Sequence, residues 1–181
     1  DHLMWRGDLS FLRSVAPAAR EVLERFDSWR GDHGLVHSPD GWNYVDWVPG
    51  IWGSGEPIGA TPGKICAPIN WQFVVAMRLF ADVEQALGEE ASADRWRIKA
   101  DDLSQRLVAH FYCEERGLLA DDSEKSAFSE HSQVLALLSG TLTGDVAASV
   151  PVKLFETPGL VPCSVYFSYY YLEACKQAGR M

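Results

Sequence analysis

The stretch SADRWRIKADDLSQRLVAHFY, residues Ser92–Tyr112, decides the fold class of this chain. Its apolar side chains recur every three or four residues, which is the spacing of one face of an α-helix. They are Trp96, Ala100, Leu103, Leu107 and Phe111. Charged and polar residues fill most other positions, so we predict an amphipathic helix that buries one face.

Weaker helical signals precede this stretch. Asp8 is a suitable N-cap for a short helix, and Pro17 suits the first turn of a second helix. Gly31 and Gly34 are expected to end that second helix. Asn70 is then the predicted N-cap of a helix over residues 71–87.

Further helices are predicted after it. Ser129 has the character of an N-cap, and Gly140 that of a C-terminal stop, for a helix over residues 130–139. A short helix over 145–150 and a last helix over 164–178 complete the pattern, while residues 117–120 look extended. Since neither a fixed-period repeat nor alternation of strand and helix occurs, we predict an all-α single domain over residues 1–181, built from αα-hairpins.

The segment Pro39–Pro68 breaks the helical pattern. It contains six Gly, five Pro and three of the seven Trp, so no long regular element is expected there. Short strands are possible around Trp42, Tyr44 and Val45, which are good strand formers. A loop of this length inside a compact domain is often functional.

Composition excludes several classes of protein. The chain has 181 residues, 47% of them apolar, and no apolar run long enough to span a membrane. A net charge of -9 disfavours nucleic acid and anionic membranes as partners. The N-terminus has neither an initiator Met nor the apolar core of a signal peptide, so we expect the chain to start inside a longer protein.

The four cysteines do not form a metal motif. Cys66, Cys113, Cys163 and Cys175 are too far apart in sequence for a Cys-x-x-Cys site, and no histidines cluster near them. We interpret them as reduced core thiols, which favours a cytoplasmic protein, and we expect neither a metal nor another cofactor.

The first candidate site lies in the long loop. Residues 40–52 combine three indole rings, Trp42, Trp47 and Trp52, with carboxylates such as Asp46. Sugar-binding sites use this mixture, because flat rings pack on the C–H faces of a pyranose while carboxylates bind its hydroxyls. The alternative is that the tryptophans only fix the loop to the core.

The second candidate site is Glu130 with His131, at the predicted N-terminus of a helix. The positive end of the helix dipole favours a carboxylate there, and both side chains would be aimed at a substrate if the helix end faces a cavity. The alternative is an ordinary acidic residue of the first turn.

Other polar clusters are interpreted as structural. We predict that Glu56 is an exposed surface carboxylate and that residues 121–124 form a solvated turn. The tyrosines at 166, 169, 170 and 171 are expected to pack mainly against the core, with one or two of them reaching a cavity.

An ordered series of motifs resembles bacterial α-L-rhamnosidases of glycoside hydrolase family 78. The motifs are Trp5-Arg6-Gly7-Asp8, Phe11-Leu12-Arg13, Pro17, Gly34-Leu35, Trp42-Asn43-Tyr44-Val45-Asp46-Trp47, Ala67-Pro68-Ile69-Asn70-Trp71-Gln72-Phe73 and Phe128-Ser129-Glu130-His131, with the tail Leu-Ala-Leu-Leu-Ser-Gly at 135–140. The series covers nearly the whole chain in the family's order, although no single motif is diagnostic.

The resemblance implies a fold, a reaction and a set of site residues. The fold is an (α/α)6 toroid of six hairpins, and the reaction is inverting hydrolysis of terminal α-L-rhamnosides by a carboxylic acid and a carboxylate base. Asp46 and Trp47 match family positions near the sugar, and Trp42, Trp52, Glu130 and His131 are further candidates for substrate binding.

This sequence departs from the family pattern at both ends. The family's general acid lies upstream of the motif matched at Trp5–Asp8, and its general base lies downstream of the last predicted helix. We therefore expect a portion of the toroid with about half of its hairpins and unknown catalytic residues. Such a portion would be inactive alone and would self-associate through exposed hairpin faces.

Two other functions remain open at this point. One is a non-catalytic carbohydrate-binding or degenerate helical domain, which would keep the fold and the aromatic loop without hydrolysis. The other is a different helical-barrel sugar enzyme, which fold analogy alone does not exclude.

Overall fold

A computed structural model describes residues 2–180 and confirms the all-α prediction. Within those residues the helices are α1 (His2–Arg6), α2 (Leu9–Asp27), α3 (Ala67–Ala86), α4 (Glu90–Phe111), α5 (Glu130–Ser139), α6 (Gly144–Glu156) and α7 (Ser168–Gln177). The strands β1 (Tyr112–Cys113) and β2 (Leu118–Leu119) form one small antiparallel hairpin.

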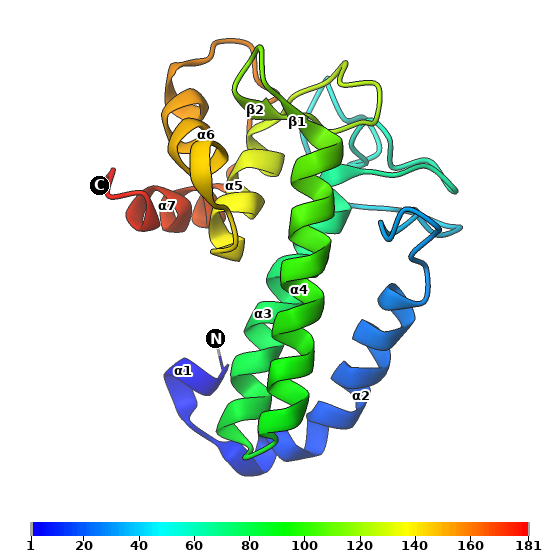
Figure 1. The fold of residues 1–181 in the computed structure, drawn as a ribbon, viewed down its shortest axis with the longest axis vertical. Coiled ribbons are helices and arrows are strands. Elements are labelled where there is room, and N and C mark those ends of the chain that lie inside the picture. The colour runs from blue at the N-terminus through cyan, green and yellow to red at the C-terminus, as the bar shows by residue number, and fades with distance from the viewer. Residues whose placement is uncertain (1, 181) are drawn as a thin grey trace.

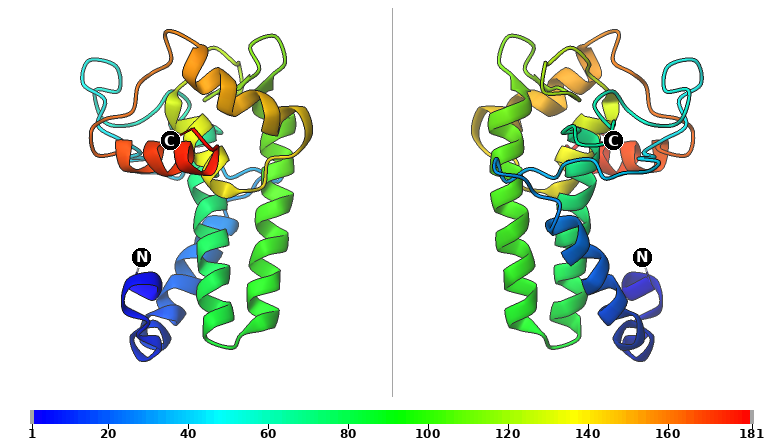
Figure 2. Two further views of the ribbon diagram at one scale, coloured as in Figure 1. Left: turned by 90° about the vertical axis from the view of Figure 1, so that its left-hand side faces the viewer. Right: turned by 90° about the vertical axis from the view of Figure 1, so that its right-hand side faces the viewer.

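The helices form antiparallel neighbours around a central hairpin. α3 and α4 run side by side along the long axis of the molecule, with α2 against α3 (Figure 1). α5, α6 and α7 gather at one end of this hairpin, where α5 packs on α3 and both α6 and α7 pack on α5 (Figure 2). This succession of antiparallel helices agrees with a portion of an (α/α)6 toroid, the fold that the family resemblance implied.

The predicted apolar face of α4 is the seam of the core. Trp96, Ala100, Leu103, Leu107 and Phe111 are all buried, and they pack against the long apolar face of α3. Burying a large apolar side chain stabilises a fold by about 1.5–3 kcal/mol, so this seam is a principal source of stability.

α2 is one helix, and the predicted division at Pro17 is wrong. Asp8 caps it as predicted, because the Asp8 carboxylate accepts hydrogen bonds from the backbone N–H groups of Ser10 (3.0 Å) and Phe11 (3.1 Å). The helix continues through Pro17 although proline removes one backbone hydrogen bond. Side chains on both sides of the proline, Leu12 and Leu23, are buried, and their packing keeps the residues before and after Pro17 in one continuous helix.

α3 begins earlier than predicted, at Ala67, and Asn70 is not its N-cap. The Asn70 side chain is fully buried and accepts a hydrogen bond from the backbone N–H of Val36 (2.8 Å). Its amide group donates to the carbonyls of Val36 and Cys66, at 2.9 Å each. Pro68 in the first helical turn supplies the start signal instead.

The predictions for the later helices differ in accuracy. α5 has the predicted bounds, since the Ser129 hydroxyl accepts from the backbone N–H of Ser132 and Gly140 takes the left-handed conformation (φ 65°). α6 is longer than predicted and continues past Pro151, whereas α7 begins four residues later than predicted, at Ser168.

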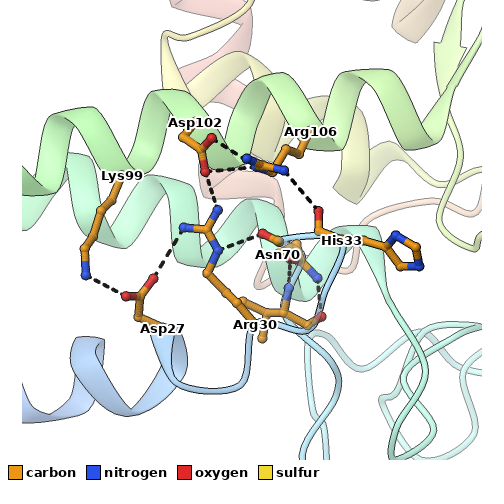
Figure 3. Close-up of polar contacts among 9 residues, drawn as sticks. Asp27, Arg30, His33, Asn70, Lys99, Asp102 and Arg106 are labelled. Atoms are coloured by element: carbon orange, nitrogen blue, oxygen red, sulfur yellow. Dashed lines mark hydrogen bonds and ion pairs between the residues drawn. The ribbon is translucent and has the colours of Figure 1, made fainter.

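Salt bridges fasten the end of α2 to α4 (Figure 3). The Asp27 carboxylate pairs with Lys99 of α4 at 2.5 Å and with Arg30 at 3.4 Å. Arg30 also binds Asp102 of α4, which in turn pairs with Arg106 at 3.0 Å. Because the five side chains form one connected network, each ion pair restricts the conformations open to the side chains of the next pair.

Candidate functional site

The tryptophan loop, residues 39–66, meets the N-terminal ends of α5 and α7. Among these residues the structure contains only isolated bridges, such as Val48 with Trp52, so the predicted short strands are absent there. Side-chain hydrogen bonds hold the loop in place, and one group of them converges on Asp46.

Asp46 is fully buried and accepts four hydrogen bonds. Its Oδ2 accepts from Nε2 of His131 (2.7 Å) and from the backbone N–H of Ser164 (2.8 Å). Its Oδ1 accepts from the Ser164 hydroxyl (2.6 Å) and from the backbone N–H of Trp47 (2.9 Å). Burial alone would raise the pKa of this carboxyl, but the hydrogen bonds from His131 and Ser164 outweigh it and hold the pKa below its usual value.

His131 occupies the first turn of α5 and is fully buried as well. Its ring lies between Trp52 and Phe167, with both ring centroids 4.5 Å away. Burial lowers the pKa of His131 and the Asp46 carboxylate opposes this only in part, so we assign a neutral ring that donates from Nε2 to Asp46. Nδ1 of His131 has no hydrogen-bond partner within residues 2–180.

The segment that precedes α7 is docked on the start of α5. The backbone N–H of Glu130 donates to the carbonyl of Val161 (2.9 Å), and the backbone N–H of Cys163 donates to the Glu130 carboxylate (2.7 Å). Glu130 is half-buried. Its carboxylate therefore has a structural partner within the chain.

Glu56 is not the exposed carboxylate that the sequence suggested. It is half-buried and accepts hydrogen bonds from the backbone N–H of Asn43 (2.7 Å) and the hydroxyl of Ser54 (3.0 Å). The Asn43 amide donates to the carbonyls of Pro39 and Ala60, at 2.9 Å each. These contacts join the two arms of the tryptophan loop.

The predicted solvated turn at residues 121–124 is also wrong for its two aspartates, which are buried. Oδ1 of Asp121 accepts from the hydroxyls of Ser129 (2.7 Å) and Ser132 (2.5 Å). Asp122 accepts from the backbone N–H groups of Ser126 and Ala127, at 2.9 Å each. Both carboxyls organise the approach to α5.

The predicted sugar-binding residues divide into an outer and an inner group. The indole rings of Trp42 and Trp47 are 66% and 54% exposed, respectively. Trp52 is only 3% exposed, and Asp46 and His131 lie beneath the surface with it. The outer rings present flat apolar faces, which is the surface that the C–H groups of a pyranose contact.

Two residues that the sequence did not single out complete the site, Ser164 and Phe167. Neither belongs to a recognisable motif, and Ser164 lies 118 positions from the carboxylate it binds. Only a signal of long-range pairing could have found them.

An open groove lies beside this site. It has a volume of about 390 Å³ and is lined by Tyr44, Val45, Gln72, Val75, Ala76, Leu79, Leu135, Leu138, Tyr166, Phe167 and Tyr170. Two tyrosines of the C-terminal region thus reach a cavity, as predicted. Tyr166, Tyr169 and Tyr170 are all exposed, so the expectation that most of these tyrosines pack in the core is wrong.

Residues 2–180 contain neither a candidate metal site nor a candidate membrane-spanning helix. No group of three His, Cys, Asp or Glu side chains there is arranged to hold a metal ion. No helix among those residues is both long and apolar enough to cross a membrane.

The antiparallel helices, with the tryptophan loop at the same end of the α3–α4 hairpin as α5 and α7 (Figure 1), agree with a portion of a helical toroid of the six-hairpin glycosidase class. The chain belongs to the family described as the bacterial alpha-L-rhamnosidase 6 hairpin glycosidase domain, whose sequence profile matches residues 3–157. No curated protein sequence matches the chain.

Two solved structures are similar to it. One is the GH78 family rhamnosidase of Bacillus sp. GL1, with 27% identity and a TM-score of 0.80 over 96% of this chain and 18% of that chain. The other is a rhamnosidase from Klebsiella oxytoca with rhamnose bound, with 19% identity and a TM-score of 0.78 over 98% of this chain and 32% of that chain. At 19% identity the second likeness concerns the fold alone. This chain thus spans less than a third of either protein.

Proposed function

We propose that this chain is part of the catalytic domain of a glycoside hydrolase that removes terminal α-L-rhamnosyl groups. The family match over residues 3–157 is the observation that carries the proposal. The similarity to the Bacillus rhamnosidase over 96% of the chain supports it. The exposed indoles of the tryptophan loop supply the kind of surface that a sugar substrate requires.

In this proposal the chain contributes one wall of the sugar site. Trp47 and Trp42 contact the substrate through their exposed rings, and Glu130, a half-buried residue beside His131 in α5, is a further candidate for contact. Asp46, His131 and Trp52 lie directly beneath this wall and support it.

The reaction itself needs two further carboxyl groups. A carboxylic acid protonates the glycosidic oxygen as the bond to the anomeric carbon breaks, while a carboxylate takes a proton from the attacking water. In an inverting enzyme these groups stand about 6.5–9.5 Å apart, which leaves room for the water. We assign neither role to a residue of this chain, which we take as a portion of the toroid.

The test is hydrolysis of an aryl α-L-rhamnoside by the product of the complete reading frame, with this chain measured beside it. We expect turnover by the complete product, with the β-anomer of rhamnose formed first and detected by proton NMR. We expect Trp47→Ala to raise KM. The matched control is Trp5→Ala, because Trp5 is an equally bulky ring, 83% exposed on α1, far along the chain from the loop.

Each other outcome rejects a part of the proposal. Turnover by this chain alone would show that the acid and base lie within it. Binding of rhamnose by the complete product without hydrolysis would favour a carbohydrate-binding or degenerate domain. Activity on a different sugar in a glycoside panel would favour another helical-barrel enzyme.

Self-association is a second part of the proposal. An apolar groove of about 380 Å³ lies between α2 and α3 and is lined by Ala19, Val22, Leu23, Ala76, Leu79, Phe80 and Val83. Leu79 is 60% exposed there, so its burial against another copy would be favourable. Light scattering on this chain should give a mass above 20.1 kDa that Leu79→Ser lowers. Ile98→Ser, at an exposed position of α4, is the control, and a monomeric chain would contradict the proposal.

A further inference from the structure

We propose that Asp46 is a positioning residue, which acts on the sugar only through the exposed indole of Trp47. This inference rests on the proposed function and goes further, because it gives Asp46, His131 and Ser164 a role distinct from contact with the substrate.

The hydrogen bonds of Asp46 leave no acceptor capacity for a sugar hydroxyl. A carboxylate has about four lone-pair directions. Oδ2 receives two donors, from His131 and the Ser164 backbone, and Oδ1 receives two more, from the Ser164 hydroxyl and the Trp47 backbone. Since the side chain is also fully buried, a substrate would have to displace one of these donors to reach it.

One of the four donors is the backbone of Trp47 itself. The bond of 2.9 Å from the Trp47 N–H to Oδ1 fixes the peptide unit from which the exposed ring projects. Burial strengthens this charge-assisted bond, because water does not compete for the carboxylate there. The orientation of the Trp47 backbone therefore depends on Asp46.

The same carboxylate joins three segments that are distant in sequence. Trp47 belongs to the tryptophan loop, His131 to the first turn of α5, and Ser164 to the segment before α7. Aromatic contacts repeat this connection, since the His131 ring lies between Trp52 of the loop and Phe167 before α7. Two sets of contacts, which share His131, thus hold the loop at one place on the helices.

The combination of Ser, His and Asp here is not a nucleophilic triad. In such a triad the histidine would accept the serine proton, whereas the Ser164 hydroxyl donates to Asp46 at 2.6 Å. The same hydroxyl oxygen accepts from the backbone N–H of Phe167 at 3.2 Å, which starts the turn into α7. Both interactions are structural, which agrees with a positioning role.

A double-mutant cycle in the complete reading-frame product tests the inference. Asp46→Asn replaces one acceptor oxygen by an NH2 group, which faces donors that the carboxylate had accepted. We expect Asp46→Asn and Trp47→Ala each to raise KM about tenfold with little change in kcat, since both weaken uniform binding. The double variant should also show about a tenfold rise in KM, because Asp46 has no effect on the substrate once the Trp47 ring that it positions has been removed. A rise of about a hundredfold in the double variant would mean independent contacts and would overturn the inference.

Two variants separate positioning from a general loss of stability. Ser164→Ala removes only the hydroxyl donor and should raise KM less than Asp46→Asn does. Glu84→Gln alters another fully buried, hydrogen-bonded carboxylate, on α3 and bonded to Arg20 and Ser92. It should lower the melting temperature and leave KM unchanged.

A spectroscopic readout keeps the inference testable if rhamnosides prove not to be substrates. The fluorine NMR signal of 5-fluorotryptophan at Trp47, assigned by its loss in Trp47→Phe, should shift in Asp46→Asn and stay in place in Glu84→Gln. An unchanged Trp47 signal in Asp46→Asn would overturn the positioning role. Absence of turnover with a shifted signal would reject only the proposed function.

Discussion

Asp121 offers the most quantitative prediction from this structure. Its Oδ1 accepts two serine hydroxyls, whereas its buried Oδ2 has no partner within residues 2–180. Burial therefore raises the pKa of Asp121 to about 6, from an ordinary value of 3.8, and the hydrogen bonds from Ser132 and Ser129 oppose this only in part. The perturbation is Asp121→Asn, which keeps the shape of the side chain and removes its proton equilibrium.

The magnitude follows from the two pKa values. Because the folded chain holds this proton more tightly than the unfolded chain, the stabilising contribution is fully present below about pH 4 and is lost as the pH rises through about 6. At about 1.4 kcal/mol for each pH unit, the loss reaches about 3 kcal/mol. Asp121→Asn has no such proton equilibrium. The difference between its free energy of unfolding and that of the wild type should therefore shift in favour of the variant by about 2–3 kcal/mol between pH 4 and pH 7.

Urea unfolding at several pH values, followed by circular dichroism, measures this difference. Asp122→Asn is the matched control, because Asp122 lies in the same turn but its hydrogen bonds from Ser126 and Ala127 outweigh burial and lower its pKa. That variant should be destabilised throughout this pH range, with recovery only below about pH 4. If the difference between Asp121→Asn and the wild type does not change with pH, the argument from burial is wrong.

Three other predictions concern buried polar groups. Glu84→Gln should lower the free energy of unfolding by about 2–3 kcal/mol at pH 7, because it breaks the paired hydrogen bonds from Arg20. The Arg20 charge that remains is partly solvated, which limits the loss. Chemical denaturation measures this change. Hydrogen bonds from Arg20 hold the pKa of Glu84 below its usual value of 4.5, so this advantage should shrink as the pH falls below 4.5, and a loss that does not change with pH would contradict the assignment. Asn70→Ala should lower the free energy of unfolding by about 2–4 kcal/mol, since it leaves both the backbone N–H and the carbonyl of Val36 unpaired, and a melting temperature equal to that of the wild type would refute this. The thiol of Cys66 is fully buried and its pKa is raised by burial, so a thiol reagent should label it only after unfolding, and rapid labelling of the native chain would disprove its burial.

Local signals explain which parts of the fold were predictable. α5 was predicted with its bounds because Ser129 and Gly140 act within one turn of the helix ends. The start of α3 was misplaced because the local capping preference of Asn70 is overridden by a partner 34 positions away, Val36. At Pro17 the local preference for a helix start is likewise overridden, here by burial on both sides of the proline.

The site was predictable in composition and not in arrangement. The mixture of tryptophan and carboxylate made the tryptophan loop a candidate, and sugar binding there stays a prediction; the structure shows only that Trp42 and Trp47 are exposed. The pairing of Asp46 with His131 was not predictable, because it joins positions 85 residues apart and no periodicity encodes it. The pairing of Glu56 with Asn43 across the loop is likewise not encoded by any periodicity, so the sequence predicted an exposed Glu56.

The distant partners of Asp46 also determine when the tryptophan loop becomes ordered during folding. The hairpin of α3 and α4 is local in sequence and closes with little loss of chain entropy, whereas the contacts at Asp46 require segments 85 and 118 residues away to arrive first. The loop therefore settles only after α5 and the start of α7 have docked. We expect Trp52, which is 3% exposed in the folded chain, to stay exposed until that step, so this end of the molecule is where a slow folding phase and aggregation would originate.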